Sequence, residues 1–581
     1  MRIRTGKTKN GRLFYVIKTY YDSHGIEHTV TVEKLGNEND IRQRTGRDPD
    51  EWAKEYVAQL NEKERLEKQD VTLTVSKTKR ITKNHQYSFQ VGYLFLQSLY
   101  HQLGFPKICK EIQKRHAFEY DLDAILSRLI YGRILQPCSK LATLKFSETL
   151  LEKPNFTEKQ IYRALDVLAE EADFIQQSLY QNSFALGKRH TGAIYYDCTN
   201  FFFEVDQQDE DGLRKYGKSK ENRPLPIVEM GMFLDKDGIP LSVCIHSGNT
   251  NEQTTLKPIE KKLLQEYNMS KFIVCTDAGL ASRANRRFNS VQNRAFIVTQ
   301  SIKTLSRELK EWALSPDGWK LAGERRKKLY DLRQIDEEKY KESTFYKERW
   351  IDRGDFEEKM IVTYSVKYRN YQRGVREGQI VRAQAAIKNG SLKRKNYRQN
   401  DYRRLVERIT VTADGECAEK EILSLNTKKI QEEAQYDGFY AVCTNLDDDP
   451  LEIIKVNRQR WEIEESFRIM KTEFKSRPAY VHTKEHIEAH FLVCFLALVV
   501  YRYLEKRLKE KFTCEAIIHT LREMKVLEVM GQGYIPEYTR TELTDAIHEA
   551  FQIHTDYQFI SSEDMKKIIK QSKQKTMYAK K

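Results

Sequence analysis

Apolar and polar side chains alternate along the first 36 residues in three runs. The runs read RIRT, RLFYVIKTYY and IEHTVTVEKLG, and the segments KTKNG and DSHG separate them. Alternation with a period of two, interrupted by glycine with asparagine or aspartate, is typical of β-hairpins. The pattern predicts a three-stranded antiparallel sheet. One face carries arginines and lysines among tyrosines, which fits either a module that grips DNA or a small structural sheet with solvated charges.

A helical spacing of apolar residues then takes over. Residues 50–70 predict a highly charged helix that serves as a solvated spacer. Between residues 88 and 187, apolar side chains recur three and four positions apart in several segments, including 122–135, and prolines separate these segments. This part of the chain is predicted to form an all-helical domain.

From residue 192 the pattern changes to strands. The runs AIYYDCTNFFFEV, LPIVEMGMFLD and IPLSVCIHSG are followed by a helical segment at 253–267, the strand KFIVCTD, a short helix near 280–289 and the strand AFIVTQ. Three strands, a helix, a strand, a helix and a strand is the element order of an RNase H-like core. The predicted fold class is therefore α/β, with a mixed sheet flanked by helices.

A long segment, 301–436, separates this core from the strand GFYAVCTN at 438–445. It is rich in charge and tyrosine, and its β-prone runs include KMIVTYSVKY. Cations interleaved with tyrosines, as in KRKNYRQNDYRR, suit contacts with phosphates and stacked bases, although a solvated face has the same composition. Downstream, the predicted helix 484–509 contains an apolar run of eleven residues. That run is too short to cross a bilayer, so the helix is expected to be buried.

Composition narrows the class of protein. The chain has 581 residues, a length for which about two to four domains are expected. A hydrophobic content of 40% excludes a disordered chain, and the net charge of +15 favours a polyanionic partner such as nucleic acid. The nine cysteines form no C-x2-C pair, which argues against a zinc site or a disulfide framework. The basic, polar N-terminus resembles no secretory signal, so a soluble intracellular protein is expected.

The segment NRQRWEIEESFRIMK, residues 457–471, carries the first candidate chemistry. At about 100° per residue in an α-helix, Arg460, Glu464 and Lys471 fall within roughly 40° of each other, and Asn457 lies at the edge of the same stripe. Glu465 points about 140° away from Arg460. The helix thus predicts one carboxylate held between two cations beside its apolar face. A solvated charged face is the alternative interpretation.

Two aspartates complete a possible catalytic set. Asp197 lies within the strand-forming run AIYYDCTNFFFEV, and Asp277 ends the run KFIVCTD. Polar groups gather near strand ends at one edge of such a sheet. Carboxylates from separate elements can bridge two hard divalent cations about 4 Å apart, as phosphodiester cleavage requires.

With these residues the sequence resembles an insertion-sequence transposase of the DDE class, in the group marked by a Y-x2-R-x3-E-x6-K helix. The motif here reads Asn457, Arg460, Glu464 and Lys471, and Trp461 follows the arginine. The resemblance extends to the residues around the two aspartates and to the segment HSGNTNEQTTL: Tyr196, Thr199, Thr276, Gly279 and 246–256. The family's tyrosine is an asparagine here. An amide can donate a hydrogen bond to a phosphate, but it cannot stack on a sugar or a base.

The resemblance implies cut-and-paste transposition of double-stranded DNA, with the terminal inverted repeats and the target as substrates. Asp197, Asp277 and Glu464 would be the catalytic residues and would hold two Mg²⁺ or Mn²⁺ ions. The DNA phosphates would be bound by Asn457, Arg460 and Lys471, and Trp461 would stack on a base. A homodimer assembled on DNA is implied, with no nucleotide cofactor and no membrane, in the cytoplasm of a bacterial or archaeal cell beside the nucleoid.

These observations divide the chain into six predicted segments. They are an N-terminal β-sheet module (1–50), a helical domain to which the resemblance assigns DNA-end binding (51–190), the first part of the RNase H-like core (191–300), a β-rich basic insertion domain (301–436), the second part of the core (437–510) and a helical C-terminal region with a basic tail (511–581). Two other functions stay open. One is a metal-dependent, structure-selective nuclease that does not join strands, and the other is a domesticated DNA-binding protein that no longer cuts.

Overall fold

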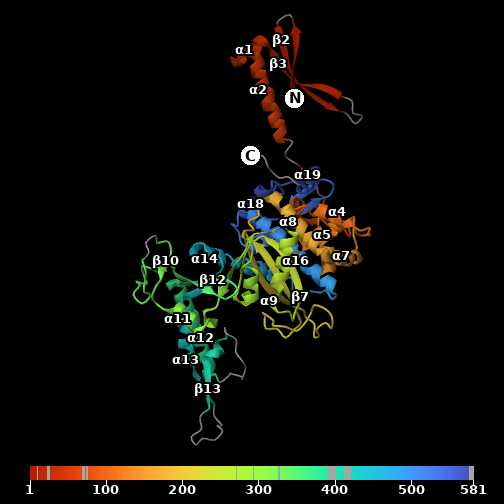
Figure 1. Ribbon diagram of the computed structural model, residues 1–581. Helices are drawn as coiled ribbons and strands as arrows, with labels where there is room; N and C mark the ends of the chain where they lie inside the picture. Colours follow the sequence, from red (N-terminus) through yellow and green to blue (C-terminus); the bar gives the residue numbers. More distant parts are fainter. Residues whose placement is uncertain are drawn as a thin grey trace. The chain divides into compact units, whose positions relative to one another are not determined.

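The computed structural model describes the whole chain except residues 9–10, 22–26, 68–71, 74–75, 268, 270, 292, 325–327, 390–400, 411–420 and 575–581. The chain divides into two compact units. The first contains Met1–His85 and Val529–Gly533, and the second contains Gln86–Glu528 and Tyr534–Lys581. Figure 1 labels the elements of both units.

The N-terminal unit is built on the predicted three-stranded sheet. Its strands β1 (Arg2–Thr8), β2 (Gly11–Tyr21) and β3 (Glu27–Asn37) are antiparallel and pair in the order β1-β2-β3. The helices α1 (Glu38–Thr45) and α2 (Pro49–Glu67) follow. Phe14 and Val16, two positions apart on β2, bury against Ala53 and Val57 of α2. The charged helix predicted at 50–70 is present, but it packs on the sheet through this apolar pair and is not solvated on all sides.

The second unit contains a mixed sheet of nine strands in the order β10-β11-β12-β15-β9-β8-β5-β6-β7. In chain order the strands are β5 (Ala193–Phe202), β6 (Ile227–Asp235), β7 (Pro240–Ser247), β8 (Phe272–Thr276), β9 (Arg294–Gln300), β10 (Lys320–Leu321), β11 (Phe345–Asp352), β12 (Glu357–Tyr364) and β15 (Phe439–Thr444). The pairs β5–β8 and β8–β9 are parallel, and every other neighbouring pair is antiparallel. The predicted mixed sheet with helices is confirmed.

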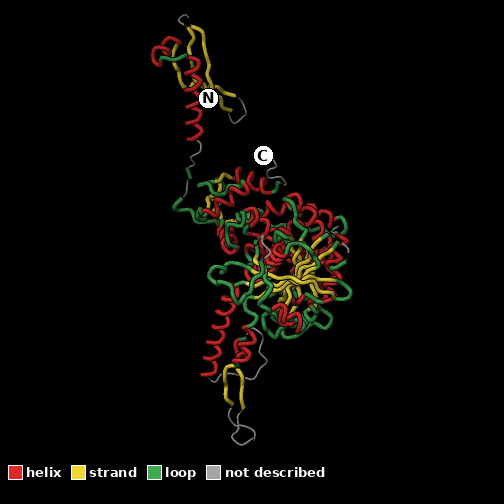
Figure 2. Tube along the Cα trace, turned by 60° about the vertical axis from the view of Figure 1, so that its left-hand side comes forward, coloured by secondary structure: helices red, strands yellow, loops and turns green. Residues whose placement is uncertain are grey.

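Alternate residues of β5 face opposite sides of the sheet. Tyr195 and Phe201 belong to the large core that includes α15 (Trp461–Thr472) and α16 (Lys484–Arg507). Tyr196 and Cys198 belong to a separate core with α9 (Glu252–Glu266), a helix on the opposite face. Figure 2 shows the strands bundled between helices. Side chains two residues apart share one face of a strand, so Asp197 points to the same side as Tyr195 and Phe201.

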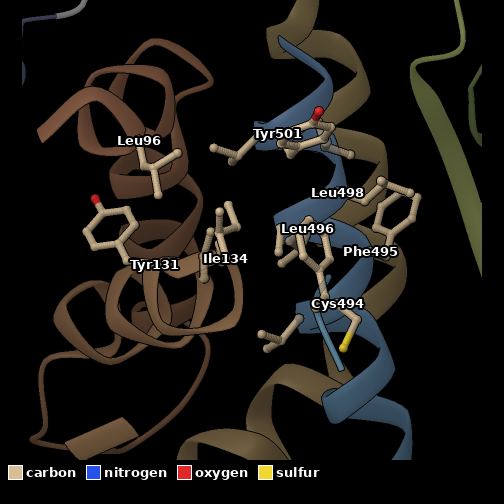
Figure 3. Close-up of a cluster of buried hydrophobic side chains, with 14 of the residues drawn as sticks. Leu96, Tyr131, Ile134, Cys494, Phe495, Leu496, Leu498 and Tyr501 are labelled. Atoms are coloured by element: carbon tan, nitrogen blue, oxygen red, sulfur yellow. The ribbon is translucent and has the colours of Figure 1, made fainter. Parts of the chain in front are cut away.

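Helix α16 is the central element of the core. It packs against α3, α5 and α7 on one side and against β7 on the other. Figure 3 shows its side chains from Cys494 to Tyr501 clustered with Leu96 of α3 and Ile134 of α5. By length and composition α16 could cross a membrane, but 89% of its most apolar window is buried inside the protein. The prediction of a buried helix at 484–509 is confirmed.

The part of the second unit in which the sequence predicted several helices, 88–187, contains six α-helices. Between residues 93 and 183 lie α3 (Tyr93–Gln102), α4 (Phe105–Gln113), α5 (Leu122–Leu135), α6 (Lys140–Glu148), α7 (Glu158–Glu170) and α8 (Ala172–Ser183). The short α10 (Arg283–Phe288) connects β8 to β9. The C-terminal region contains α17 (Cys514–Glu523), α18 (Glu542–Phe551) and α19 (Ser562–Ser572), with a small sheet of β18 (Ile560–Ser561), β17 (Gly533–Pro536), β16 (Lys525–Val529) and β4 (Ser88–Gln90).

The segment 301–436 differs from the β-rich insertion domain that the sequence suggested. Its strands β10, β11 and β12 extend the main sheet. The apolar side chains of β12 pack in one core with Phe296 and Val298 of β9. The longest element of the segment is a helix of 23 residues, α12 (Val366–Lys388). The remaining elements are α11 (Arg307–Leu314), the hairpin of β13 (Val406–Thr410) with β14 (Glu421–Leu425), and α13 (Thr427–Ala434). Most of the predicted basic clusters at 325–328 and 393–404, and the end of the lysine-rich tail, lie outside the described residues.

Candidate active site

Asp197 and Asp277 lie side by side on neighbouring parallel strands. The register pairs Ala193 with Ile273 and Tyr195 with Cys275. Two residues further along, the same register brings Asp197 beside Asp277, which follows the last residue of β8. Each carboxylate is oriented by a backbone amide: Asp197 Oδ1 accepts from the N–H of Cys198 at 2.8 Å, and Asp277 Oδ1 accepts from the N–H of Leu280 at 3.0 Å. The predicted convergence of the two aspartates is observed.

The segment 457–471 is not one continuous helix. The helix α14 (Pro450–Arg458) ends before Gln459, and α15 starts at Trp461. The hydroxyl of Tyr195 lies 3.0 Å from both the carbonyl oxygen of Val456 and Oε1 of Gln459, and it thereby ties this turn to β5. The single helical stripe predicted for Asn457 to Lys471 is therefore wrong at its N-terminal end, because the helix is interrupted between Arg458 and Trp461.

Helix α15 runs along β5 in the same direction. Its N-terminal turn is anchored at Tyr195, and Nζ of Lys471 lies 5.3 Å from the ring centroid of Phe201. Six residues of a strand span about 20 Å. Twelve residues of a helix span about 18 Å. The two elements therefore cover similar lengths, and the start of α15 lies near Asp197.

Arg460 links two of the predicted catalytic carboxylates. One terminal nitrogen of its guanidinium lies 3.9 Å from Oδ2 of Asp197, and the other lies 2.9 Å from Oε1 of Glu464. The Glu464 carboxylate is thus separated from Asp197 by a single guanidinium, and 58% of its side chain is exposed. The neighbouring Glu465 pairs instead with Arg468 at 2.6 Å. Arg460 therefore relates Glu464, and not Glu465, to Asp197.

Burial perturbs the ionisation of Asp197. Burial raises the pKa of its carboxyl to about 6, and the negative charge of Asp277 adds to the rise, while Lys220, the Cys198 N–H and Arg460 oppose it. Two carboxylates that share a site disfavour each other's ionisation. A cation bound between them would remove this penalty.

Lys220 is a site residue that the sequence analysis missed. It lies in the loop between β5 and β6, its ammonium donates to the carbonyl of Cys198, and it pairs with Glu252 at 3.1 Å. Burial alone would lower the pKa of Lys220, but the carboxylates of Asp197 and Glu252 raise it. Nothing in the local pattern KSKEN distinguishes this lysine from a solvated one, so only the folded chain reveals it.

Glu229 is a buried glutamate close to Lys220 and Glu252. Glu229 of β6 is the register partner of Asn200, and one of its carboxylate oxygens is buried without a hydrogen bond. Burial and the neighbouring Glu252 raise the pKa of Glu229 to about 8. A charged residue in the apolar run LPIVEMGMFLD was the available sequence signal for this group.

The other predicted DNA contacts have different surroundings. Lys471 lies 3.4 Å from Oε1 of Glu221, and burial lowers its pKa. Asn457 is only 2% exposed, and its amide donates to the hydroxyl of Tyr440 at 2.7 Å. This burial argues against the phosphate contact predicted for Asn457. Trp461, by contrast, is 57% exposed at the first turn of α15.

The aspartate pair suits a divalent cation, but the third ligand is not in place. Within the part of the chain that the structure describes, no three His, Cys, Asp or Glu side chains are grouped closely enough to hold a metal ion. Asp197 and Asp277 offer two adjacent carboxylates in a partly buried site, and burial raises the pKa of Asp197. Glu464 is drawn toward Arg460 and would have to turn to complete the set.

Comparisons with known proteins indicate the family of the chain. A solved structure described as a cryo-EM structure of the piggyBac transposase synaptic complex with hairpin DNA is 8% identical, with a TM-score of 0.35, over 85% of this chain and 87% of that one. A likeness this low does not indicate function. Among curated proteins none matches. The profile of the family described as the transposase DDE domain matches residues 201–500, more than half of the chain, including Asp277 and Glu464 and starting four residues after Asp197. The chain therefore belongs to the transposase DDE domain family.

Proposed function

We propose that this protein is a cut-and-paste DNA transposase that nicks DNA at the ends of an element and joins the freed 3′ ends to target DNA. The observation that carries the proposal is the pairing of Asp197 with Asp277, together with the guanidinium that links Glu464 to Asp197. Membership of the transposase DDE domain family supports the same class of reaction.

Asp197, Asp277 and Glu464 are proposed to hold divalent metal, as two Mg²⁺ or Mn²⁺ ions. Such ions, when bound, lower the pKa of an attacking water or 3′-hydroxyl and stabilise the leaving oxygen. The protein contributes the fixed positions of the two aspartates, which the parallel register and the two backbone amides hold in place. It also contributes a partly buried site, in which electrostatic interactions are stronger than in water.

Arg460 is proposed to exchange partners when DNA binds. Its ion pair with the exposed Glu464 is of the surface kind, worth about 0–1 kcal/mol. A DNA phosphate accepts two parallel hydrogen bonds from a guanidinium and competes well for it. Once Arg460 turns to the phosphate, the Glu464 carboxylate is free to join the aspartates. Substrate binding and completion of the acidic set would then be one event.

Two neighbouring side chains are proposed to position DNA. Trp461 exposes its indole beside Arg460, where an unpaired base could stack on it. Lys471 would contact a phosphate, which requires it to leave Glu221. The partner is proposed to be double-stranded DNA, bound by a homodimer in the cytoplasm without a nucleotide cofactor.

Strand cleavage tests the proposal directly. The substrate is a plasmid carrying the DNA that borders the gene, where inverted repeats would mark the element ends. Asp197→Asn, Asp277→Asn and Glu464→Gln should each abolish Mg²⁺-dependent nicking and leave DNA binding in EDTA within about twofold. Glu465→Gln is the matched control, because it changes the next carboxylate, which pairs with Arg468.

Three results would contradict the proposal. Nicking that survives Glu464→Gln but is lost in Glu465→Gln would show that the catalytic carboxylate is Glu465, on another face of α15. Cleavage without joining, measured with pre-cleaved ends and a target plasmid, would favour the structure-selective nuclease instead. A wild-type protein that binds these ends but never nicks them would favour the domesticated DNA-binding protein.

A further inference from the structure

Lys140 and Arg133 are two of the buried cations of the second unit that have no carboxylate partner among the described residues. Lys140 is 4% exposed and Arg133 is 5% exposed, and neither forms an ion pair with another described residue. A buried charge is strongly unfavourable unless it is paired. The guanidinium of Arg133 donates to the carbonyl oxygen of Phe474 at 3.1 Å, but its Nε is buried with no hydrogen bond.

The contacts of Lys140 leave its charge uncompensated. Its ammonium lies 3.4 Å from Nδ1 of His490, and Nε2 of His490 lies 3.0 Å from the carbonyl oxygen of Ser476. A carbonyl only accepts, so Nε2 carries the proton and the neutral imidazole accepts from Lys140 through Nδ1. Lys140 is also the first residue of α6, the positive end of the helix dipole, where a cation is disfavoured.

Both cations open onto one cavity. It has a volume of about 260 Å³, and four cationic side chains line it: Arg133, Lys140, Lys475 and Arg477. No aspartate or glutamate is among its lining residues, and Tyr480 at its rim is exposed. Ligand pockets for larger molecules are typically ~300–1,000 Å³, so this cavity suits a small anionic group.

The cavity is connected to the candidate active site. Arg477, which lines it, lies 3.0 Å from Glu221, and the same oxygen of Glu221 lies 3.4 Å from Lys471 at the end of α15. The guanidinium of Arg477 also stacks over Phe202 of β5, the strand that carries Asp197. A strand of DNA that leaves the site along α15 would therefore reach the cavity next.

We propose that this cavity, lined by Arg133, Lys140 and Arg477, binds a backbone phosphate of the DNA strand that the active site holds. That the ligand is DNA rests on the proposed function. That the ligand is an anion rests on the buried cations without a carboxylate partner. The phosphate would supply the counter-charge that the fold lacks, and Tyr480 would lie beside the adjoining nucleotide. Burial and Arg133 lower the pKa of Lys140 to about 7, and a bound phosphate would raise it again.

Lys140→Met tests the site, with Lys145→Met on an exposed position of the same helix as the control. The first probe is inorganic phosphate, compared with NaCl of equal ionic strength, and the readout is the thermal midpoint of the full-length protein. Wild type and Lys145→Met should gain stability from phosphate, and Lys140→Met should lose that gain. Without phosphate, Lys140→Met should melt no lower than wild type, because it removes an unpaired buried charge. Lys140→Gln, a smaller change, repeats the test if the methionine does not fit.

The second probe is duplex DNA from the border of the gene, titrated in EDTA so that no strand is cut. Lys140→Met should weaken binding about three- to tenfold and make the slope of log K against log salt shallower by about 0.9, the value for one lost phosphate contact. Unchanged DNA binding and an unchanged slope would overturn the proposal. A gain in thermal midpoint from phosphate that is as large in Lys140→Met as in the wild type would also overturn it. A Lys140-dependent phosphate response without any effect on DNA would overturn the assignment to DNA. Because no cleavage is measured, a failure of the transposase proposal would show separately, in the nicking assay.

Discussion

Tyr195→Phe isolates the contact that positions α15 over the aspartates. The tyrosine is buried, and its hydroxyl lies 3.0 Å from the carbonyl oxygen of Val456 and 3.0 Å from Oε1 of Gln459. One hydroxyl has one proton, so the substitution removes a single donated hydrogen bond, worth about 1 kcal/mol and up to about 3 kcal/mol if the buried carbonyl stays unpaired. The thermal midpoint should fall by no more than about 4 °C per kcal/mol.

The effect on catalysis should be larger than the effect on stability. The turn that Tyr195 holds carries Arg460, which contacts both Asp197 and Glu464. A displacement of about 1 Å in a catalytic group can cost up to about 100-fold in rate. Tyr195→Phe should therefore slow nicking by about 10- to 100-fold, while DNA affinity in EDTA stays within about twofold.

Tyr196→Phe is the matched control for this experiment. Tyr196 is the next residue of β5 and is equally buried, but its hydroxyl lies 2.7 Å from Oγ1 of Thr255 on the opposite face of the sheet. It should cost similar stability and leave the nicking rate near that of wild type. Equal nicking rates for the two variants would refute the reasoning that the hydrogen bond to the 456–459 turn sets the geometry of the site.

The remaining predictions concern charge in the same site. The folded-state pKa of Asp197 is raised from 3.8 to about 6, so its contribution to stability is full below pH 3.8 and is lost as the pH rises through 6; the shift corresponds to about 3 kcal/mol. Asp197→Asn should therefore stabilise the metal-free protein by up to that amount at pH 8 and little at pH 4, as measured by denaturant unfolding in EDTA; equal effects at both pH values would contradict the assigned shift. Mg²⁺ should raise the thermal midpoint of the wild type and fail to do so in Asp277→Asn, since one of the paired carboxylates is lost. Arg460→Gln should slow nicking about 100-fold, because a positioned charge next to the reacting phosphate is removed. Arg468→Gln, the matched change on the outer face of α15, should leave nicking unchanged.

Sequence periodicity was sufficient for the elements whose environment is mainly local. The alternation of β2 and the apolar spacing of α5 and α16 follow from which face each element buries, and the structure has them where the pattern placed them. The i, i+4 pair of Arg460 and Glu464 lies within a single helical turn, so its contact could also be read from spacing.

Two contacts of the segment 457–471 could not be predicted from local spacing. Asn457 was assigned to the phosphate-binding stripe on the assumption of one helix, but the turn anchored by Tyr195 directs it toward Tyr440 instead. Lys471 is three turns along the predicted stripe, yet it pairs with Glu221 from a loop that no local pattern connects to it. Both outcomes depend on partners more than 15 residues away in the chain.

The sequence by itself determined the mixed sheet and the buried helix α16, because strand alternation and helical spacing are local properties. Only the tertiary structure decided that Asp197 lies beside Asp277, that Lys220 lies beside Asp197 and Glu252, and that Lys140 is buried. These arrangements depend on the register between strands and on the burial of charges by distant segments. Local propensity does not encode either of them.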